Sequence, residues 1–325
     1  MKKSLCLALL LISFALPHAV ATGLPDRHAA EIQYEDDAAS TQAPLPPGAT
    51  LRRDVPYGSD PLQRMDVYIP AQAQNAPVIF MVHGGGWRRG DKASRTVVDN
   101  KMSHWVSQGY LFISVNYRML PEADPAVQAE DVAKALATAQ TLAPRWGGNP
   151  SMFLVMGHSA GAHLVALLSS DPARAYRVRA QPWLGTVALD SAAMDVPRLM
   201  QQRHLPLYDE AFGNDPTYWR SVSPLQSLTA QAMPLLAVCS SRRRESCENA
   251  RLYAAAAERL GVRVSILPED LSHREINDQL GLPGSYTSGV EQFMKSLGLP
   301  VAEAQPIAEA QHARAPLRRR FLRRE

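Results

Sequence analysis

A single Gly-x-Ser-x-Gly pentapeptide, Gly157-His158-Ser159-Ala160-Gly161, constrains the fold of this chain more than any other feature. An apolar run, residues 152–156, precedes it, and a helix-like stretch, residues 162–169, follows it. This order predicts a strand, a sharp turn and a helix, with the serine in a strained backbone conformation and its hydroxyl exposed. Small residues on both sides of the serine would let the strand and the helix pack closely. The alternative interpretation is a glycine-rich turn without chemistry.

A second glycine-rich motif follows an earlier apolar run. Residues 78–82 are rich in strand formers and lead directly into His83-Gly84-Gly85-Gly86-Trp87. Glycines let backbone N–H groups turn toward a ligand without side-chain obstruction, and such donors stabilise the negative oxygen of a tetrahedral acyl intermediate. We therefore expect an oxyanion hole formed by the N–H groups of Gly84, Gly85 and Ala160. The alternative is a turn that a packing tryptophan caps.

The two motifs together resemble the α/β-hydrolase superfamily, and most closely its HGGGW-type esterases, the group related to hormone-sensitive lipase, feruloyl and acetyl esterases and arylformamidases. The resemblance covers roughly residues 50–298 and also rests on four shorter segments: Gly90-Asp91-Lys92, Asn116-Tyr117-Arg118, Asp131-Val132-Ala133 and Ser272-His273. It implies an α/β-hydrolase fold, with a mostly parallel central sheet, helices on both faces and a small insertion after the sixth strand. That insertion, residues 190–228, would overhang the serine and line a pocket.

In the resembling fold the nucleophile, the acid and the base histidine follow one another along the chain, so the base comes after Ser159. His273 follows a strand-like run, residues 262–267, in a short polar loop, and we predict it as the base. Three other histidines follow Ser159, and their places exclude them. His163 lies on the nucleophile's own helix, His204 comes before two further strand-like segments, and His312 lies in the C-terminal tail.

The acid is harder to assign. The resemblance places an Asp or Glu just after the seventh strand, which we expect at residues 234–238, but Ser241 or Arg242 stands there. Glu245 is the carboxylate that we predict as the acid, although it would also be favourable in the first turn of a helix for its interaction with the helix dipole. Three other carboxylates remain open as the acid: Asp190, Asp195 and Glu248.

The first residues indicate export. Two lysines precede an apolar run, residues 5–16, and an Ala-x-Ala site, so we expect a signal peptide cleaved after Ala21 and a periplasmic or secreted protein. The run is too short to span a bilayer, and no stable membrane anchor is expected. In an oxidising compartment Cys239 and Cys247 should form a disulfide. Two cysteines without a nearby histidine do not make a zinc site, and no metal site is expected.

Composition divides the chain into four segments. After the signal peptide, residues 1–21, comes a polar and proline-rich linker, residues 22–48, and then the catalytic domain, residues 49–298. The last segment, residues 299–325, is rich in alanine and arginine and is expected to be disordered. The formal net charge is only +3, and basic residues gather in this tail, so the domain is not expected to bind nucleic acid.

These observations predict an exported serine hydrolase that cleaves carboxylic esters through an acyl-enzyme intermediate, without a cofactor. The expected substrate is a small-molecule ester, including sugar or phenolic esters. One alternative is an arylformamidase-like amidase that shares the machinery. The other is a non-catalytic binding protein of the same fold, which is suggested by the absence of an Asp or Glu just after the seventh strand. The acyl length, the alcohol and the oligomeric state are left open by the sequence.

Overall fold

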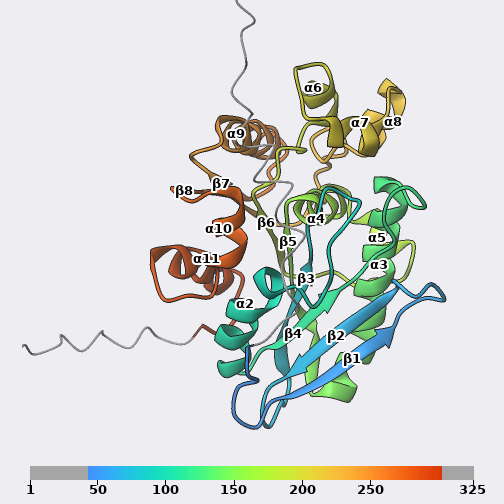
Figure 1. The fold of residues 1–325 in the computed structure, drawn as a ribbon. Coiled ribbons are helices and arrows are strands. Elements are labelled where there is room, and N and C mark those ends of the chain that lie inside the picture. Colours follow the sequence, from blue (N-terminus) through green and yellow to red (C-terminus); the bar gives the residue numbers. More distant parts are fainter. Residues whose placement is uncertain (1–42, 302–325) are drawn as a thin grey trace, which may run out of the picture.

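An eight-stranded sheet forms the centre of the molecule, which a computed structural model describes over residues 43–301 (Figure 1). The strand order is β1-β2-β4-β3-β5-β6-β7-β8, and only the pairs that involve β2 are antiparallel. The strands are β1 (Thr50–Pro56), β2 (Arg64–Ile69), β3 (Ala76–Val82), β4 (Leu111–Val115), β5 (Gly148–His158), β6 (Gly185–Leu189), β7 (Leu235–Ser240) and β8 (Val264–Glu269). The predicted α/β fold with a mostly parallel sheet is confirmed.

Helices cover both faces of this sheet because each central strand is apolar on both sides. In β3 all seven residues are buried, as is typical of strands in parallel sheets. Phe80 aligns with Ile113 and Val155 on the neighbouring strands, and these three belong to the core that α3 and α4 cover. Ile79 belongs to the opposite core, with α2 and α11. The helices of the two layers are α2 (Arg95–Ser107), α3 (Pro125–Leu142), α4 (Ala160–Ser170), α5 (Ala173–Tyr176), α9 (Arg244–Glu258), α10 (His273–Asp278) and α11 (Ser285–Ser296), with a 3-10 helix at Ala143–Trp146.

The predicted insertion after the sixth strand is present. Between β6 and β7 the chain forms three short helices, which stand apart from the sheet at the top of Figure 1: α6 (Val196–Met200), α7 (Pro206–Phe212) and α8 (Pro216–Ser221). Each of these helices has a proline at its first or second residue. A proline there costs no helical hydrogen bond, because the N–H that it lacks would have no partner within the helix. The insertion therefore lies over the carboxyl ends of the central strands, where the serine turn is found.

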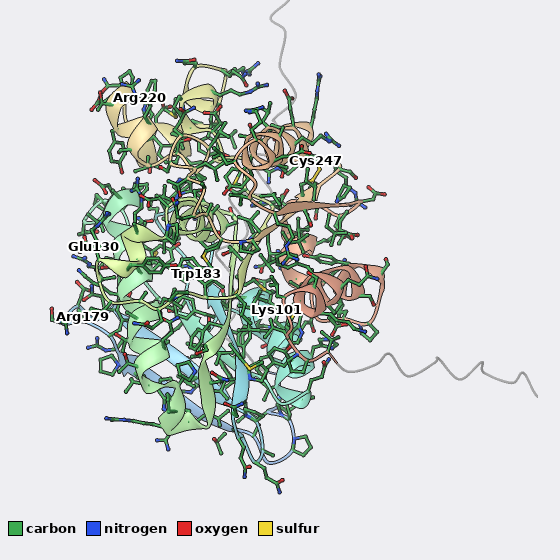
Figure 2. All side chains as sticks on the ribbon, turned by 180° about the vertical axis from the view of Figure 1, so that it is seen from behind. Lys101, Glu130, Arg179, Trp183, Arg220 and Cys247 are labelled. Carbon is green, nitrogen blue, oxygen red and sulfur yellow. A yellow bond between two sulfur atoms is a disulfide. The ribbon has the colours of Figure 1, made fainter. Side chains whose placement is uncertain are left out.

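The interior is filled with side chains, and one of them is a lysine. Figure 2 shows Glu130, Arg179 and Arg220 at the periphery, whereas Lys101 and Trp183 are buried. The Lys101 amine donates hydrogen bonds to the carbonyls of Thr96 and Asn277, and burial lowers its pKa to about 7. The bond to Asn277 joins α2 to α10, the helix that begins at His273.

The remaining sequence predictions concern parts of the chain outside this range. The predicted signal peptide, nearly all of the predicted linker and most of the predicted tail lie beyond the described residues, and those predictions stand as they are. Within residues 43–301, no helix combines the length and the apolar character needed to cross a membrane.

Candidate active site

Ser159 stands on the predicted turn between β5 and α4. Its φ of 54° and ψ of −117° place it in a conformation that costs a non-glycine residue energy. The turn is tight because both flanking glycines are needed. A Cβ on Gly157 would lie 2.5 Å from the Gly161 carbonyl oxygen, and a Cβ on Gly161 would lie 2.4 Å from that of Val82. The strand–turn–helix arrangement predicted from the pentapeptide is therefore present.

His273 reaches Ser159 from the other side of the turn. It is the first residue of α10, a helix that begins with a capping box between Ser272 and Glu275. Its Nε2 lies 2.9 Å from the Ser159 Oγ, and its side chain is 2% exposed. The predicted base histidine thus lies where it can accept the serine proton.

The structure corrects the predicted acid. Asp190, one of the open alternatives, lies directly after β6 with Oδ2 2.6 Å from the His273 Nδ1. Glu245 lies in the first turn of α9 with its side chain 52% exposed, and its Oε1 is 3.7 Å from the Arg243 Nε. The exposed position fits the alternative interpretation of Glu245, a carboxylate at a helix N-terminus.

The other two candidate acids have structural partners. Asp195 caps α6 by accepting a hydrogen bond from the Arg198 N–H. Glu248 forms an ion pair with the Arg198 side chain. Asp190, in contrast, contacts the His273 ring directly, so of the candidates the geometry selects Asp190.

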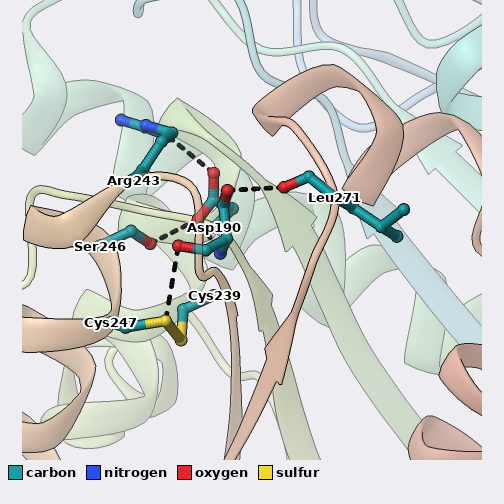
Figure 3. Close-up of a disulfide and its surroundings, with 7 residues drawn as sticks. Asp190, Cys239, Arg243, Ser246, Cys247 and Leu271 are labelled. Carbon is teal, nitrogen blue, oxygen red and sulfur yellow. Dashed lines mark hydrogen bonds and ion pairs between the residues drawn. A yellow bond between two sulfur atoms is a disulfide. The ribbon is translucent and has the colours of Figure 1, made fainter.

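Asp190 is completely buried and held by four groups, of which Figure 3 labels Arg243 and Ser246. Its Oδ1 accepts from the Ser240 N–H at 2.8 Å and from the Ser246 hydroxyl, and its Oδ2 accepts from the Arg243 Nη1 at 2.7 Å besides His273. Burial by itself would raise the pKa of this carboxyl. The Arg243 charge and the hydrogen bonds hold the pKa well below its usual range instead, so Asp190 is a carboxylate at neutral pH.

The predicted disulfide is confirmed, and it lies next to this cluster. Cys239 near the end of β7 and Cys247 in α9 are joined, with their Cα atoms 5.1 Å apart (Figure 3). The bridge therefore holds the first turn of α9 against the end of β7. The first turn of α9 carries Ser246 and is adjacent to Arg243, and the end of β7 carries Ser240, which binds Asp190. A loop this short contributes about 2–3 kcal/mol of stability in the chain-entropy description.

The glycine motif lies against the serine, and its three glycines line two different cavities. A Cβ on Gly84 would lie 2.9 Å from the Ser159 Cβ. Gly86 and Ala160 line the cavity that contains Ser159 and His273, whereas Gly84 and Gly85 line a neighbouring hollow beside His83. Gly86, the third glycine of the same run, is not one of the residues expected to form the oxyanion hole.

Two further groups of residues hold the site in place. Tyr117 stacks on His83 and donates to its carbonyl oxygen, so the residues after β4 support the glycine motif. His158, the second residue of the pentapeptide, approaches the His273 carbonyl with Nε2 at 3.0 Å. Burial lowers the pKa of His158 well below its ordinary value, so this imidazole is neutral and can donate one hydrogen bond.

The insertion forms one wall of the cavity. Trp87 of the glycine motif donates from Nε1 to the His163 Nδ1 and packs against Tyr208 and Phe212 of α7. His163 in turn contacts the Val222 carbonyl through Nε2, and burial lowers its pKa to about 4. His163 therefore joins the nucleophile's helix to the insertion, consistent with its exclusion as the base.

Comparisons with known proteins agree with this description. The BD-FAE family model matches residues 65–176. Esterase LipC of Mycobacterium tuberculosis (strain ATCC 25618 / H37Rv) is 28% identical over 208 residues, which are 59% of this chain and 51% of LipC. Kynurenine formamidase of Danio rerio is 27% identical over 235 residues, 70% of this chain and 76% of the relative. The chain thus spans about half the length of LipC.

The fold is shared with solved esterase structures. Esterase B from Lactobacillus rhamnosis superimposes with a TM-score of 0.63 at 19% sequence identity, covering 83% of this chain and 91% of that one. At this low sequence identity the similarity shows the fold alone. The chain therefore has the α/β-hydrolase fold, and over part of its length it is similar to known esterases.

Proposed function

We propose that this protein is a serine hydrolase that cleaves carboxylic esters. The observation that carries the proposal is the continuous set of contacts from Ser159 through His273 to Asp190, with distances of 2.9 Å and 2.6 Å. A strained serine, a histidine at its hydroxyl and a buried carboxylate at the far ring nitrogen are the recurring parts of nucleophilic acyl transfer.

The residues divide the reaction as follows. The Ser159 Oγ attacks the ester carbonyl while His273 Nε2 takes its proton, and Asp190 accepts the Nδ1–H and stabilises the imidazolium. In this proposal the N–H groups of Ala160 and of the glycine motif donate to the resulting oxyanion. His273 then protonates the leaving alcohol, and water attacks the acyl-enzyme with the same histidine as base, which releases the acid and restores the serine.

There are two alternative functions. An amidase would use the same site, and a non-catalytic binding protein would carry out no reaction. The similarity to a kynurenine formamidase, which extends over 76% of that protein, supports an amidase that acts on formylated aromatic amines. The similarity to the esterase LipC supports an ester substrate. A non-catalytic binding protein was suggested by the missing acid, and Asp190 at His273 argues against it.

The ester proposal is tested with purified full-length protein and the p-nitrophenyl esters of acetate, butyrate and octanoate, beside N-formylaniline as the amide. We expect kcat/KM for at least one ester to exceed that for the amide, and we expect a fluorophosphonate to add to Ser159, as seen by mass spectrometry. Faster cleavage of the formamide would favour the amidase instead. If no substrate is turned over and no adduct forms, the binding-protein alternative gains.

We also propose export, which the buried disulfide supports because disulfides persist in oxidising compartments. Expression in a bacterial host should give a periplasmic form whose N-terminal residue is Thr22, determined by intact-mass and N-terminal analysis. Cytoplasmic protein that retains residues 1–21 and carries reduced cysteines would contradict this proposal.

A further inference from the structure

A buried arginine lies behind the histidine of the site. Arg243, in the loop between β7 and α9, is only 4% exposed. Its Nη1 donates to the Asp190 Oδ2 at 2.7 Å (Figure 3). The same Nη1 lies 2.5 Å from the His273 Nδ1. The loop is the one in which the resembling family carries its acid, so a positive charge stands close to where a negative one would be expected.

This charge changes the electrostatics of the acyl-transfer site. Asp190 must stabilise the imidazolium of His273, yet the same carboxylate oxygen already neutralises Arg243. The reactive tautomer of His273 also carries its hydrogen on Nδ1, so that this N–H and the Arg243 N–H both point at Asp190 and repel each other. An additional anion at Arg243 would offset the extra positive charge and favour the imidazolium.

The guanidinium has a hydrogen-bonding edge that its protein neighbours leave incomplete. The Arg243 Nε is buried and has no hydrogen-bond partner among residues 43–301. The Glu245 Oε1 lies 3.7 Å from it, beyond hydrogen-bond distance, on a side chain that is 52% exposed. The N–H groups along one edge of a guanidinium form a rigid fork that matches the two oxygens of a carboxylate.

Arg243 is also within reach of a bound substrate. It lines the same cavity as Ser159, Ala160 and His273, together with Tyr208, whose hydroxyl interacts with the guanidinium. A single imidazole ring separates Arg243 from the serine, with contacts of 2.9 Å on one side and 2.5 Å on the other. A carboxylate joined to the ester carbonyl by a short aliphatic chain has the length to bridge this separation.

We propose that Arg243 binds a carboxylate on the acyl group of the substrate, so that the preferred substrates are half-esters of short dicarboxylic acids. The inference rests on the proposed ester hydrolysis and names its substrate class. Arg243 acts here as a specificity-determining residue, while the attack and the proton transfers stay with Ser159 and His273. A purely structural role for Arg243, as the ion-pair partner of Asp190, is the opposing explanation.

The test compares monoethyl glutarate with ethyl pentanoate, a neutral ester of the same acyl length, by proton release in a pH-stat. For the wild-type protein we expect kcat/KM to favour the half-ester by about tenfold to a hundredfold, the range expected for hydrogen bonds to a charged group. In Arg243→Met this preference should vanish, mainly through a higher KM for the half-ester. Arg243→Lys, which keeps the charge but not the fork, should retain part of it.

Glu245→Gln is the matched variant, and its expected effect on the preference for the half-ester is opposite to that of Arg243→Met. Removal of the half-exposed carboxylate near the Arg243 Nε should increase the preference for the half-ester, because one repelling charge is lost. A structural role predicts something else: Arg243→Met would lower kcat/KM for both esters by the same factor, and Glu245→Gln would leave the ratio unchanged. Either of these results overturns the inference.

A binding measurement separates this inference from the proposed function. Calorimetric titration of Ser159→Ala with monoethyl glutarate needs no turnover, and we expect binding that Arg243→Met, combined with Ser159→Ala, abolishes. If the wild type hydrolyses both esters equally and Ser159→Ala binds no half-ester, the anion site is refuted and ester hydrolysis stands. If neither ester is hydrolysed while the half-ester still binds through Arg243, ester hydrolysis is refuted and the anion site stands.

Discussion

Ser159→Ala is expected to lower kcat on p-nitrophenyl butyrate by about 10⁶-fold, the size of effect seen when a serine nucleophile is removed from such a site. Ser159 is the residue whose Oγ lies 2.9 Å from the His273 Nε2, and alanine leaves no group to form the acyl-enzyme. Rates are compared at saturating substrate with the same enzyme preparation, and the fold of the variant is checked by circular dichroism.

Ser191→Ala is the control for this experiment. Ser191 lines the same cavity, but its hydroxyl accepts a hydrogen bond from the Ala193 N–H. Its kcat should stay within a few-fold of the wild type, since no step of the proposed reaction uses it. A loss below about 100-fold in Ser159→Ala would mean that another nucleophile, or water alone, accounts for the turnover.

Asp190→Asn is expected to lower kcat by about 10⁴-fold, because an amide in this position favours the wrong tautomer of the histidine. The effect should be measured beside Glu245→Gln on a neutral ester, where we expect a change of no more than about twofold for this half-exposed side chain. Together the two variants separate the acid selected by the structure from the acid that the sequence predicted.

Stability must be measured with activity in this pair. Asp190→Asn also removes the charge that neutralises buried Arg243, and breaking a buried ion pair costs about 3–5 kcal/mol. Urea unfolding will therefore show a destabilised protein, and kcat is to be taken where the variant is still folded. Equal losses of kcat in Asp190→Asn and Glu245→Gln, or a loss in Glu245→Gln alone, would restore Glu245 as the acid.

Local sequence determined the parts of the site that are built from neighbouring residues. The strand before Ser159, its turn and the following helix are specified by an apolar run and by glycines that admit close backbone approach. His273 could be found because chain order excluded the earlier histidines and because it follows a strand-like run, residues 262–267. The disulfide followed from two cysteines close in sequence. In each case the residues that decide the outcome lie within a few positions of one another.

Only the tertiary structure decided which carboxylate reaches the histidine. The ends of β6 and β7 are neighbours in the sheet, with Leu189 paired to Val238, so loops from both deliver charged side chains to the same place. Asp190 turns inward to His273, and Arg243 takes the space beside it while Glu245 faces solvent. Those directions depend on sheet pairing and on burial of a charge with its partners, which are set by residues far apart in the chain.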